Sequence, residues 1–376
     1  MASESVSSLD RRFLDVAIRL GKSRIGRCAP NPSVGAIIVD TSTETPVVIG
    51  RGVTGDRGRP HGEVIALGEA GARAKGATCY VSLEPCAHHG KTPPCVDALI
   101  KAGVARVVVA KIDPDPRVSG KGLDTLRQHG VVVSVDDKRP EARDSQLGHD
   151  VRASHARPAF KLKLAISPDG KIGLREEGNV PVTGEAVRAR VHALRARSDA
   201  ILIGIGTALA DDPELTCRLD GMADWSPERV VLDSEARLPL SSKLVAGLDK
   251  VPLRVLTSES ANSQRVAALE ARGVKAERLP ASLSGISIPD IGKALYRAGH
   301  TSVMIEGGSV VARSFLDGGF IDEAYIFLGQ TPIGENGVDI LPNGESIDEA
   351  LERAGLERSH PDESIEGDRL VRWSKP

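Results

Sequence analysis

The chain has 376 residues, of which 40% are hydrophobic, 27% charged and 3% aromatic, and its formal net charge is −2. A single hydrophobic core rarely grows beyond about 250–300 residues, so this length predicts two domains. The near-neutral charge argues against nonspecific nucleic-acid or membrane binding, and the few aromatics argue against stacking on single-stranded nucleic acid.

No stretch of the sequence is typical of export or of a membrane span. Residues 1–10 are polar, and no run approaches the ~20 apolar residues of a membrane helix. Five cysteines without a targeting segment are typical of a reducing compartment. We therefore expect a cytoplasmic protein in which a cysteine with a special role is a metal ligand or a nucleophile.

The first 135 residues alternate between strand-like and helix-like segments. The apolar spacing of Leu9, Phe13, Val16, Ala17 and Leu20 predicts an opening helix with these residues on its buried face. Strands are expected at residues 34–39, 47–53, 77–83, 106–112 and 131–135, and further helices at 62–74, 95–102 and 120–128. This alternation predicts an α/β sandwich with a largely parallel sheet.

A charged segment at residues 139–158 reads as a hinge, followed by a second strand–helix series. Strands are expected at residues 160–166, 200–205, 230–232, 253–257, 302–305 and 323–328, and a last strand at 370–373 should return to the same sheet. We therefore expect domains at residues 1–154 and 155–376.

The first domain carries a candidate zinc site. His61 and Glu63 begin a helical pattern, and Cys86 and Cys95 follow in Pro85-Cys86 and Pro94-Cys95. One His and two Cys ligands leave a fourth position for water, whose pKa zinc lowers to about 7. Glu63 is then the expected acid/base, which carries a proton from that water to the ring nitrogen and the departing amine.

Other readings of these residues remain open. His88 and His89 flank the site and could compete as ligands, while Cys28, Cys79 and Cys217 read as small buried apolar groups. A purely structural zinc usually has four protein ligands and needs no acid/base, so Glu63 argues against it.

The segment Pro85–Cys95, with Ala29-Pro30-Asn31-Pro32 before it and Asp113-Pro114-Asp115-Pro116 after it, resembles the bifunctional riboflavin-biosynthesis deaminase/reductase family. The resemblance implies a cytidine-deaminase-like three-layer sandwich followed by a dihydrofolate-reductase-like α/β domain. It also implies zinc-dependent deamination of a diaminopyrimidinone ribosylamino 5′-phosphate, then NADPH reduction of the ribosyl group to ribityl. In the deaminase domain, the substrate-binding positions that it implies are Asn31, His88, Lys91 and Thr92.

The second half lacks a Gly-x-Gly-x-x-Gly fingerprint after its first strand, but Glu306-Gly307-Gly308-Ser309 stands between a strand-like and a helical segment. Glycines there allow a diphosphate to approach backbone N–H groups at a helix start. By resemblance, the substrate-binding positions are Asn179, Arg195, Leu215, Arg218 and Glu306. The cofactor-binding positions implied in the same way are Ala165, Pro181, Thr207, Asp211, Ser234, Gly308, Ser309, Val310, Val311, Ala312, Arg313 and Ser314.

The chain departs from the family pattern at a few positions. Gly62 stands where an alanine is usual, a change expected to cost under about 1 kcal/mol. Asn179 and Pro181 replace a serine and a tryptophan, and Pro168 replaces an aliphatic residue.

Two alternatives follow from these departures and from the deaminase motif. One is an active deaminase whose degenerate reductase domain serves binding or dimerisation. The other is a tRNA base deaminase, which the near-neutral charge disfavours. The expected partners are a small pyrimidine nucleotide and further copies of the chain in a homo-oligomer, with no nucleic acid and no membrane.

Overall fold

The structure is a computed structural model that describes residues 5–174, 181–282, 285–341 and 345–376. Asn179 lies outside these described residues. The chain divides into two compact units, Met1–Ala156 and Arg157–Pro376. Among the described residues, every helix is too short or too polar to cross a lipid bilayer.

The first unit is a three-layer sandwich around a five-stranded sheet of order β2-β1-β3-β4-β5. Its strands are β1 (Gly35–Asp40), β2 (Val47–Val53), β3 (Thr78–Val81), β4 (Arg106–Val109) and β5 (Val132–Val135). The sheet is mixed rather than largely parallel, because β1 runs antiparallel to both β2 and β3, whereas β3, β4 and β5 are parallel.

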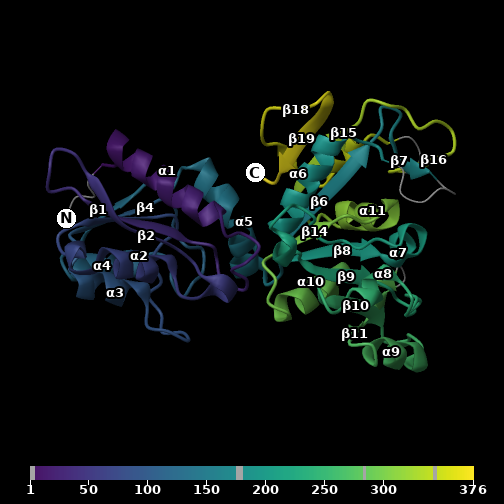
Figure 1. Cartoon of the computed structure of the whole chain (residues 1–376), viewed down its shortest axis with the longest axis horizontal. Helices are drawn as coiled ribbons and strands as arrows, with labels where there is room; N and C mark the ends of the chain where they lie inside the picture. The colour runs from purple at the N-terminus through teal and green to yellow at the C-terminus, as the bar shows by residue number, and fades with distance from the viewer. Residues whose placement is uncertain (1–4, 175–180, 283–284, 342–344) are drawn as a thin grey trace. The chain divides into compact units, whose positions relative to one another are not determined.

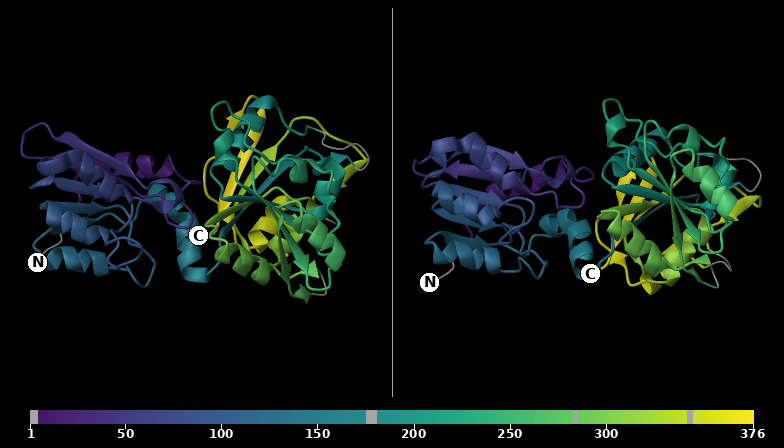
Figure 2. Two further views of the ribbon diagram at one scale, coloured as in Figure 1. Left: turned by 60° about the horizontal axis from the view of Figure 1, so that its bottom comes forward. Right: turned by 90° about the horizontal axis from the view of Figure 1, so that it is seen from below.

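Helices cover both faces of this sheet, as Figures 1 and 2 show. The helices are α1 (Ser8–Lys22), α2 (Gly62–Ala70), α3 (Cys95–Ala102), α4 (Lys121–Gln128) and α5 (Pro140–His155), with 3-10 turns at Asp56–Gly58 and Gly71–Ala74. Apolar residues of α1 and α5 share one core cluster with the sheet, and those of α2, α3 and α4 share the other. This arrangement confirms the expected cytidine-deaminase-like sandwich.

The buried face of α1 differs from the predicted one. Leu14, Ala17 and Ile18 are buried, whereas Leu9 and Val16 are 39% and 38% exposed. The inner face also includes the carboxylate of Asp10, which accepts hydrogen bonds from Tyr80 Oη and Arg106 Nη1, both at 2.8 Å. The Asp10 carboxylate is therefore buried and hydrogen-bonded at a position that the apolar periodicity predicts to face solvent.

The segment predicted as a hinge is mostly the helix α5. Pro140 stands in its first turn, where its fixed φ suits a helix start. Its buried residues are mostly small or polar, and Gln146 donates a hydrogen bond to the Ser33 carbonyl at 3.0 Å. Because few large apolar residues mark the buried side, the periodicity rule does not detect this helix.

The second unit contains a ten-stranded sheet of order β11-β10-β9-β8-β14-β6-β15-β19-β17, with β18 paired to β19. Neighbouring strands from β11 through β15 are parallel, and β19 joins β15 antiparallel, so the expected return of the last strand is confirmed. The strands are β6 (Ala159–Ile166), β8 (Ala200–Gly204), β9 (Glu228–Leu232), β10 (Leu253–Ser258), β11 (Lys275–Leu279), β14 (Ser302–Ile305), β15 (Ile321–Leu328), β17 (Glu357–Arg358), β18 (Glu363–Ile365) and β19 (Asp368–Ser374).

Helices pack on both faces of this twisted sheet (Figure 2). The helices are α6 (Glu185–Ala196), α7 (Ile205–Asp211), α8 (Lys243–Ala246), α9 (Ser263–Glu270), α10 (Ile288–Arg297), α11 (Ser309–Asp317) and α12 (Ile347–Arg353), with a 3-10 turn at Ala223–Trp225. Two small two-stranded sheets stand apart from the main sheet: β7 (Lys171–Leu174) with β16 (Gly337–Asp339), and β12 (Ala281–Ser282) with β13 (Gly285–Ile286). In parallel sheets, ligands gather beyond the carboxyl ends of the strands, which here lead into α7 and α11.

Candidate functional site

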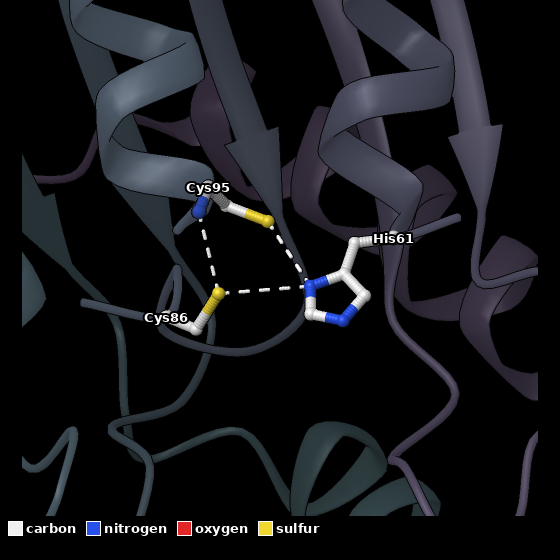
Figure 3. Close-up of side chains that lie close together, drawn as sticks. All are labelled: His61, Cys86 and Cys95. Atoms are coloured by element: carbon white, nitrogen blue, oxygen red, sulfur yellow. Dashed lines mark hydrogen bonds between the residues drawn. The ribbon is translucent and has the colours of Figure 1, made fainter. Parts of the chain in front are cut away.

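Three side chains of the first unit converge on one point (Figure 3). The sulfur atoms of Cys86 and Cys95 and one ring nitrogen of His61 lie within 4.8 Å of one another. His61 Nδ1 is 3.2 Å from Cys95 Sγ and 3.6 Å from Cys86 Sγ. One imidazole and two thiolates form a ligand set that suits Zn²⁺ and leaves a coordination position for water.

Helix starts hold two of the three ligands. His61 is the N-cap of α2, and Cys95 is the first residue of α3. The backbone N–H of Cys95 donates to Cys86 Sγ at 3.3 Å, so the start of α3 also faces the second sulfur. Partial positive charge at a helix start favours the thiolate form, as metal binding requires.

Glu63, in the first turn of α2, is 3% exposed beside this cluster. Burial, reinforced by the charge of Cys86, raises the pKa of Glu63 to about 7. Hydrogen bonds from Cys95 and His61 lower the pKa of Cys86 to about 4, against the opposing effect of burial. A carboxyl with a pKa near neutrality can both take up and release a proton at physiological pH.

Neighbouring residues brace the cluster. Asn31 Nδ2 donates to the Gly58 carbonyl at 3.0 Å and lies 3.4 Å from His61 Nε2, on the ring edge away from the sulfurs. Glu84, two residues before Cys86, accepts backbone hydrogen bonds from Asp113, Gly120 and Gly122. The cluster is therefore fixed by contacts with three separate loops.

In the second unit, two cavities meet at the starts of α7 and α11. One has a volume of about 550 Å³ and a largely apolar lining, and the other has a volume of about 490 Å³. Both are lined by Ile172, Thr207, Asp211 and Gly308. A long ligand can therefore extend from one cavity into the other.

The smaller cavity is strongly polar. Arg195 Nε and Nη2 donate to the two carboxylate oxygens of Glu306 at 2.7 and 2.9 Å. Burial would raise the pKa of Glu306, but the charges of Arg195 and Lys163 outweigh it and lower the pKa to about 2. Arg188 and Arg218 add two further cations to the lining. The excess of positive charge suits a phosphorylated ligand.

Comparison with known proteins decides the family. Residues 7–111 match the cytidine and deoxycytidylate deaminase zinc-binding region, and residues 158–363 match the RibD C-terminal domain. A riboflavin biosynthesis protein RibD of Aquifex aeolicus is 38% identical over 92% of this chain and 94% of its own length. The chain belongs to the RibD family.

Other family members match over almost the full chain. The RibD of Escherichia coli K12 is 33% identical, over 91% of this chain and 94% of its own length. An Acinetobacter baumannii RibD structure superimposes with a TM-score of 0.83 at 32% identity, covering 97% of this chain and 98% of its own. A Thermotoga maritima structure, a diaminohydroxyphosphoribosylaminopyrimidine deaminase/5-amino-6-(5-phosphoribosylamino)uracil reductase, gives 0.82 at 31% identity, covering 98% and 99%. This RibD-family chain is thus a zinc-dependent deaminase fused to an NADPH-dependent reductase of riboflavin biosynthesis.

Most of the residues that the sequence nominates for the RibD reductase site line the two cavities. The smaller cavity contains Ala165, Pro181, Arg195, Thr207, Asp211, Leu215, Arg218, Glu306 and Gly308. The larger contains Thr207, Asp211, Ser234, Gly308, Ser309, Val310, Val311 and Ser314. Pro181, which the resemblance assigns to the cofactor, lies in the lining of the smaller cavity.

Two nominated residues line neither of these cavities. Ala312 is fully buried in the core, and Arg313 pairs with Asp317 on the outside of α11 at 3.0 Å. Both stand on α11, where successive residues point in directions about 100° apart. A run of seven consecutive residues on a helix cannot therefore all face one ligand.

The nominated deaminase residues lie around the metal loop between Cys86 and Cys95. His88 is half-buried, and its Nδ1 is a buried atom without a hydrogen-bond partner among the described residues. Thr92 accepts a hydrogen bond from Arg59, while Lys91 is exposed. Among the residues the structure describes, His88 and His89 are not part of the metal-ligand cluster. Cys28, Cys79 and Cys217 are buried, as predicted, and form no disulfide among the described residues.

Several residues that line the two cavities were not predicted from the sequence. Lys163 and His192 line the smaller cavity, and Arg237 lines the larger. Lys163 stands inside the apolar run at residues 160–166, between the buried Leu162 and Leu164, and a lysine in such a place is itself a signal. His192 and Arg237 stand in ordinary amphipathic surroundings, and no local pattern separates them from surface residues.

Proposed function

We propose that this chain catalyses two consecutive steps on one phosphorylated pyrimidine. The first is hydrolytic deamination of 2,5-diamino-6-(5-phosphoribosylamino)pyrimidin-4-one, and the second is reduction of its ribosyl group to ribityl. The observation that carries the proposal is the convergence of His61, Cys86 and Cys95 beside the buried carboxyl of Glu63. The substrate class is that of the Thermotoga maritima relative, which is similar over nearly the whole chain.

In the deaminase unit, His61, Cys86 and Cys95 are the proposed zinc ligands. When bound, Zn²⁺ supplies Lewis-acid activation of a water molecule at neutral pH. Glu63 would take one proton of that water and deliver it to the ring nitrogen, and would then carry the second proton of the same water to the amine, which leaves as ammonia. Its pKa of about 7 suits both proton transfers.

The same unit supplies proposed substrate contacts. Asn31, beside His61 Nε2, orients the imidazole and contacts the pyrimidine, and His88, Lys91 and Thr92 line the substrate side of the metal loop. Glu63 is shielded from bulk solvent by its burial, so the proton that it takes from the reacting water moves to the substrate rather than to solvent.

In the reductase unit, the larger cavity is the proposed cofactor site and the smaller one the substrate site. When bound, NADPH supplies the hydride. Ser309, the first residue of α11, offers its backbone N–H to the diphosphate, and Gly308 before it lines the same cavity while its own N–H donates to Thr207 Oγ1 at 3.0 Å. Thr207 and Asp211 stand where the two cavities join.

The smaller cavity holds the proposed groups for the phosphate and the sugar. Arg195 and Arg218 bind the substrate phosphate, while Glu306 keeps the Arg195 guanidinium in place through its two hydrogen bonds. Leu215 provides apolar lining on the substrate side, and Ala165, a proposed cofactor contact by resemblance, lines the same cavity. Asn179 stays a proposed substrate contact on resemblance alone.

A two-stage assay tests the function. Purified protein with one zinc per chain should release ammonia from the diaminopyrimidinone nucleotide, and the product should then oxidise NADPH, seen as loss of nicotinamide absorbance. Ammonia release without NADPH oxidation would favour an active deaminase with a degenerate reductase unit. Absence of both would refute the proposal.

We further propose a cytoplasmic, homo-oligomeric enzyme. The five cysteines form no disulfide among the described residues, and two of them belong to the metal-ligand cluster, which is compatible with a reducing compartment. The oligomer rests on family resemblance, and light scattering coupled to size-exclusion chromatography measures it directly.

A further inference from the structure

Arg59 bridges the approach to the metal cluster. It stands two residues before His61, in the loop between β2 and α2, and is half-buried. Its Nη1 donates a hydrogen bond to Thr92 Oγ1 in the metal loop. A Cβ atom placed on Gly90 of the same loop would lie 3.6 Å from Arg59 Nη2. The guanidinium therefore lies across the loop that joins Cys86 to Cys95.

The charge of Arg59 is not neutralised by the protein. Within residues 5–174, and elsewhere in the described chain, no carboxylate oxygen comes within 4.0 Å of the Arg59 guanidinium or of Lys91 Nζ. The neighbouring Arg24 and Arg27 differ, because both form ion pairs with Asp56. Arg59 and Lys91 are thus two cations at the metal loop without a carboxylate partner among the described residues, whereas Arg24 and Arg27 have one.

The position of the Arg59 guanidinium is unfavourable for a metal site as long as no anion is bound beside it. Arg59 stands two residues before His61 and reaches Thr92 in the loop that joins Cys86 to Cys95, so its guanidinium lies near the cluster. A cation close to the cluster repels a divalent metal ion. An anion bound between Arg59 and Lys91 would offset both the repulsion and the lack of a carboxylate partner.

We propose that Arg59 binds the 5′-phosphate of the deaminase substrate together with Lys91, while Thr92 holds the guanidinium in place. The inference rests on the proposed function, whose substrate carries one phosphate. The guanidinium has five N–H donors in a fork that matches phosphate oxygens, and Thr92 uses one of them. Lys91, the residue before Thr92, adds a flexible point charge from the same loop.

The test compares two substrates that differ only in the phosphate: the nucleotide and the same ribosylamino nucleoside without it. For Arg59→Ala, kcat/KM on the nucleotide should fall about 10- to 100-fold, mostly through KM. On the nucleoside it should change less than about twofold, with zinc content unchanged. Arg59→Lys should recover part of the loss, because it keeps the charge but not the fork.

Arg57→Ala is the matched control. Arg57 carries the same charge in the same loop and is exposed, and its side chain has no hydrogen bond or ion pair within the described residues. Its kcat/KM on the nucleotide should stay within about twofold of wild type. An equal loss of kcat/KM on the nucleotide in Arg57→Ala would mean that both arginines act by general electrostatic attraction. It would overturn the specific contact between Arg59 and the phosphate.

Two further outcomes also overturn the inference. Equal losses on nucleotide and nucleoside in both Arg59 variants would mean that Arg59 acts through the metal loop rather than on the phosphate. Unchanged kinetics on the nucleotide would remove it from the binding site. Failure of the proposed function is distinguishable from either, because wild-type protein would then deaminate neither compound.

Discussion

The two halves of the chain build their sites in different ways. In the deaminase unit, His61, Glu63, Cys86 and Cys95 converge on one point, and two helix starts hold three of them. In the reductase unit, two cavities of about 550 and 490 Å³ are lined from many elements, with no dominant cluster. A metal-ligand set has a fixed number of ligands and fixed distances, whereas a cofactor cleft distributes recognition over many weaker contacts.

This contrast predicts different responses to mutation. One lost ligand should abolish the deaminase, because three protein ligands leave no redundancy. One lost lining residue should weaken the reductase by a factor that depends on the charge removed. The units also have separate cores, so damage to one activity should leave the other measurable.

The largest effect is expected for Cys86→Ser. The hydroxyl is a poor replacement for a thiolate, so the protein should lose its zinc and more than about 10³-fold of its deamination rate. Metal analysis together with ammonia release measures both. NADPH oxidation with the deaminated intermediate should persist, and its loss would show that the two sites are not independent.

Glu63→Gln separates chemistry from metal binding. The amide fills the same space but cannot take up the proton, so the deamination rate should fall about 10²- to 10⁴-fold while zinc stays bound. The same two assays apply. Near-normal turnover with full zinc occupancy would assign the proton transfer to another group.

The deaminase site could be predicted from sequence because its signal is local. The ligand types, their order and their positions at helix starts are visible in short segments, and the structure brings the three ligands together as expected. What the sequence did not predict depends on distant contacts. A Cβ at Gly62 would lie 2.4 Å from the Val34 carbonyl oxygen. The close approach of the Val34 backbone, rather than helix propensity, therefore favours glycine at this position.

The reductase fold was predictable in outline, and its site less so. The strands at residues 200–204 and 302–305 have the nearly continuous apolar composition of a buried parallel sheet. Arg237, in a loop after β9, and His192, in α6, by contrast, become lining residues only when segments far apart in sequence meet. The helix α5 was missed for a related reason, since its buried residues are small or polar.

Arg218→Ala should give an intermediate effect confined to the reductase. Arg218 lines the smaller cavity, and its ion pair with Glu214 is more than half exposed, so the substitution should hardly change stability. Loss of one cation from the phosphate site should raise the KM of the deaminated intermediate about tenfold. If deamination fell in parallel, the assignment of Arg218 to the second site would be wrong.

Arg237→Ala tests the cofactor end of the same unit. Arg237 is the only cation that lines the larger cavity among the described residues, and NADPH carries one more phosphate than NADH. The substitution should raise the KM for NADPH several-fold and change that for NADH little. Titration with 2′,5′-ADP measures the contact without turnover, and equal affinity in both proteins would place the extra phosphate elsewhere.

The smallest expected effect concerns stability rather than activity. Burial would raise the pKa of Glu228, but His300, Arg254 and Lys275 outweigh it and lower the pKa to about 2. A lowered folded-state pKa contributes stability that is complete above the unfolded value near 4.5 and disappears as the pH falls toward 2. Glu228→Gln should therefore lower the free energy of unfolding by roughly 2–3 kcal/mol at pH 7, and its difference from wild type should narrow steadily below pH 4.5.

Both tryptophans, Trp225 and Trp373, belong to the reductase unit, so their fluorescence during urea unfolding follows that unit alone. A gap that stayed constant down to pH 3 would mean that the carboxylate charge does not stabilise this sheet.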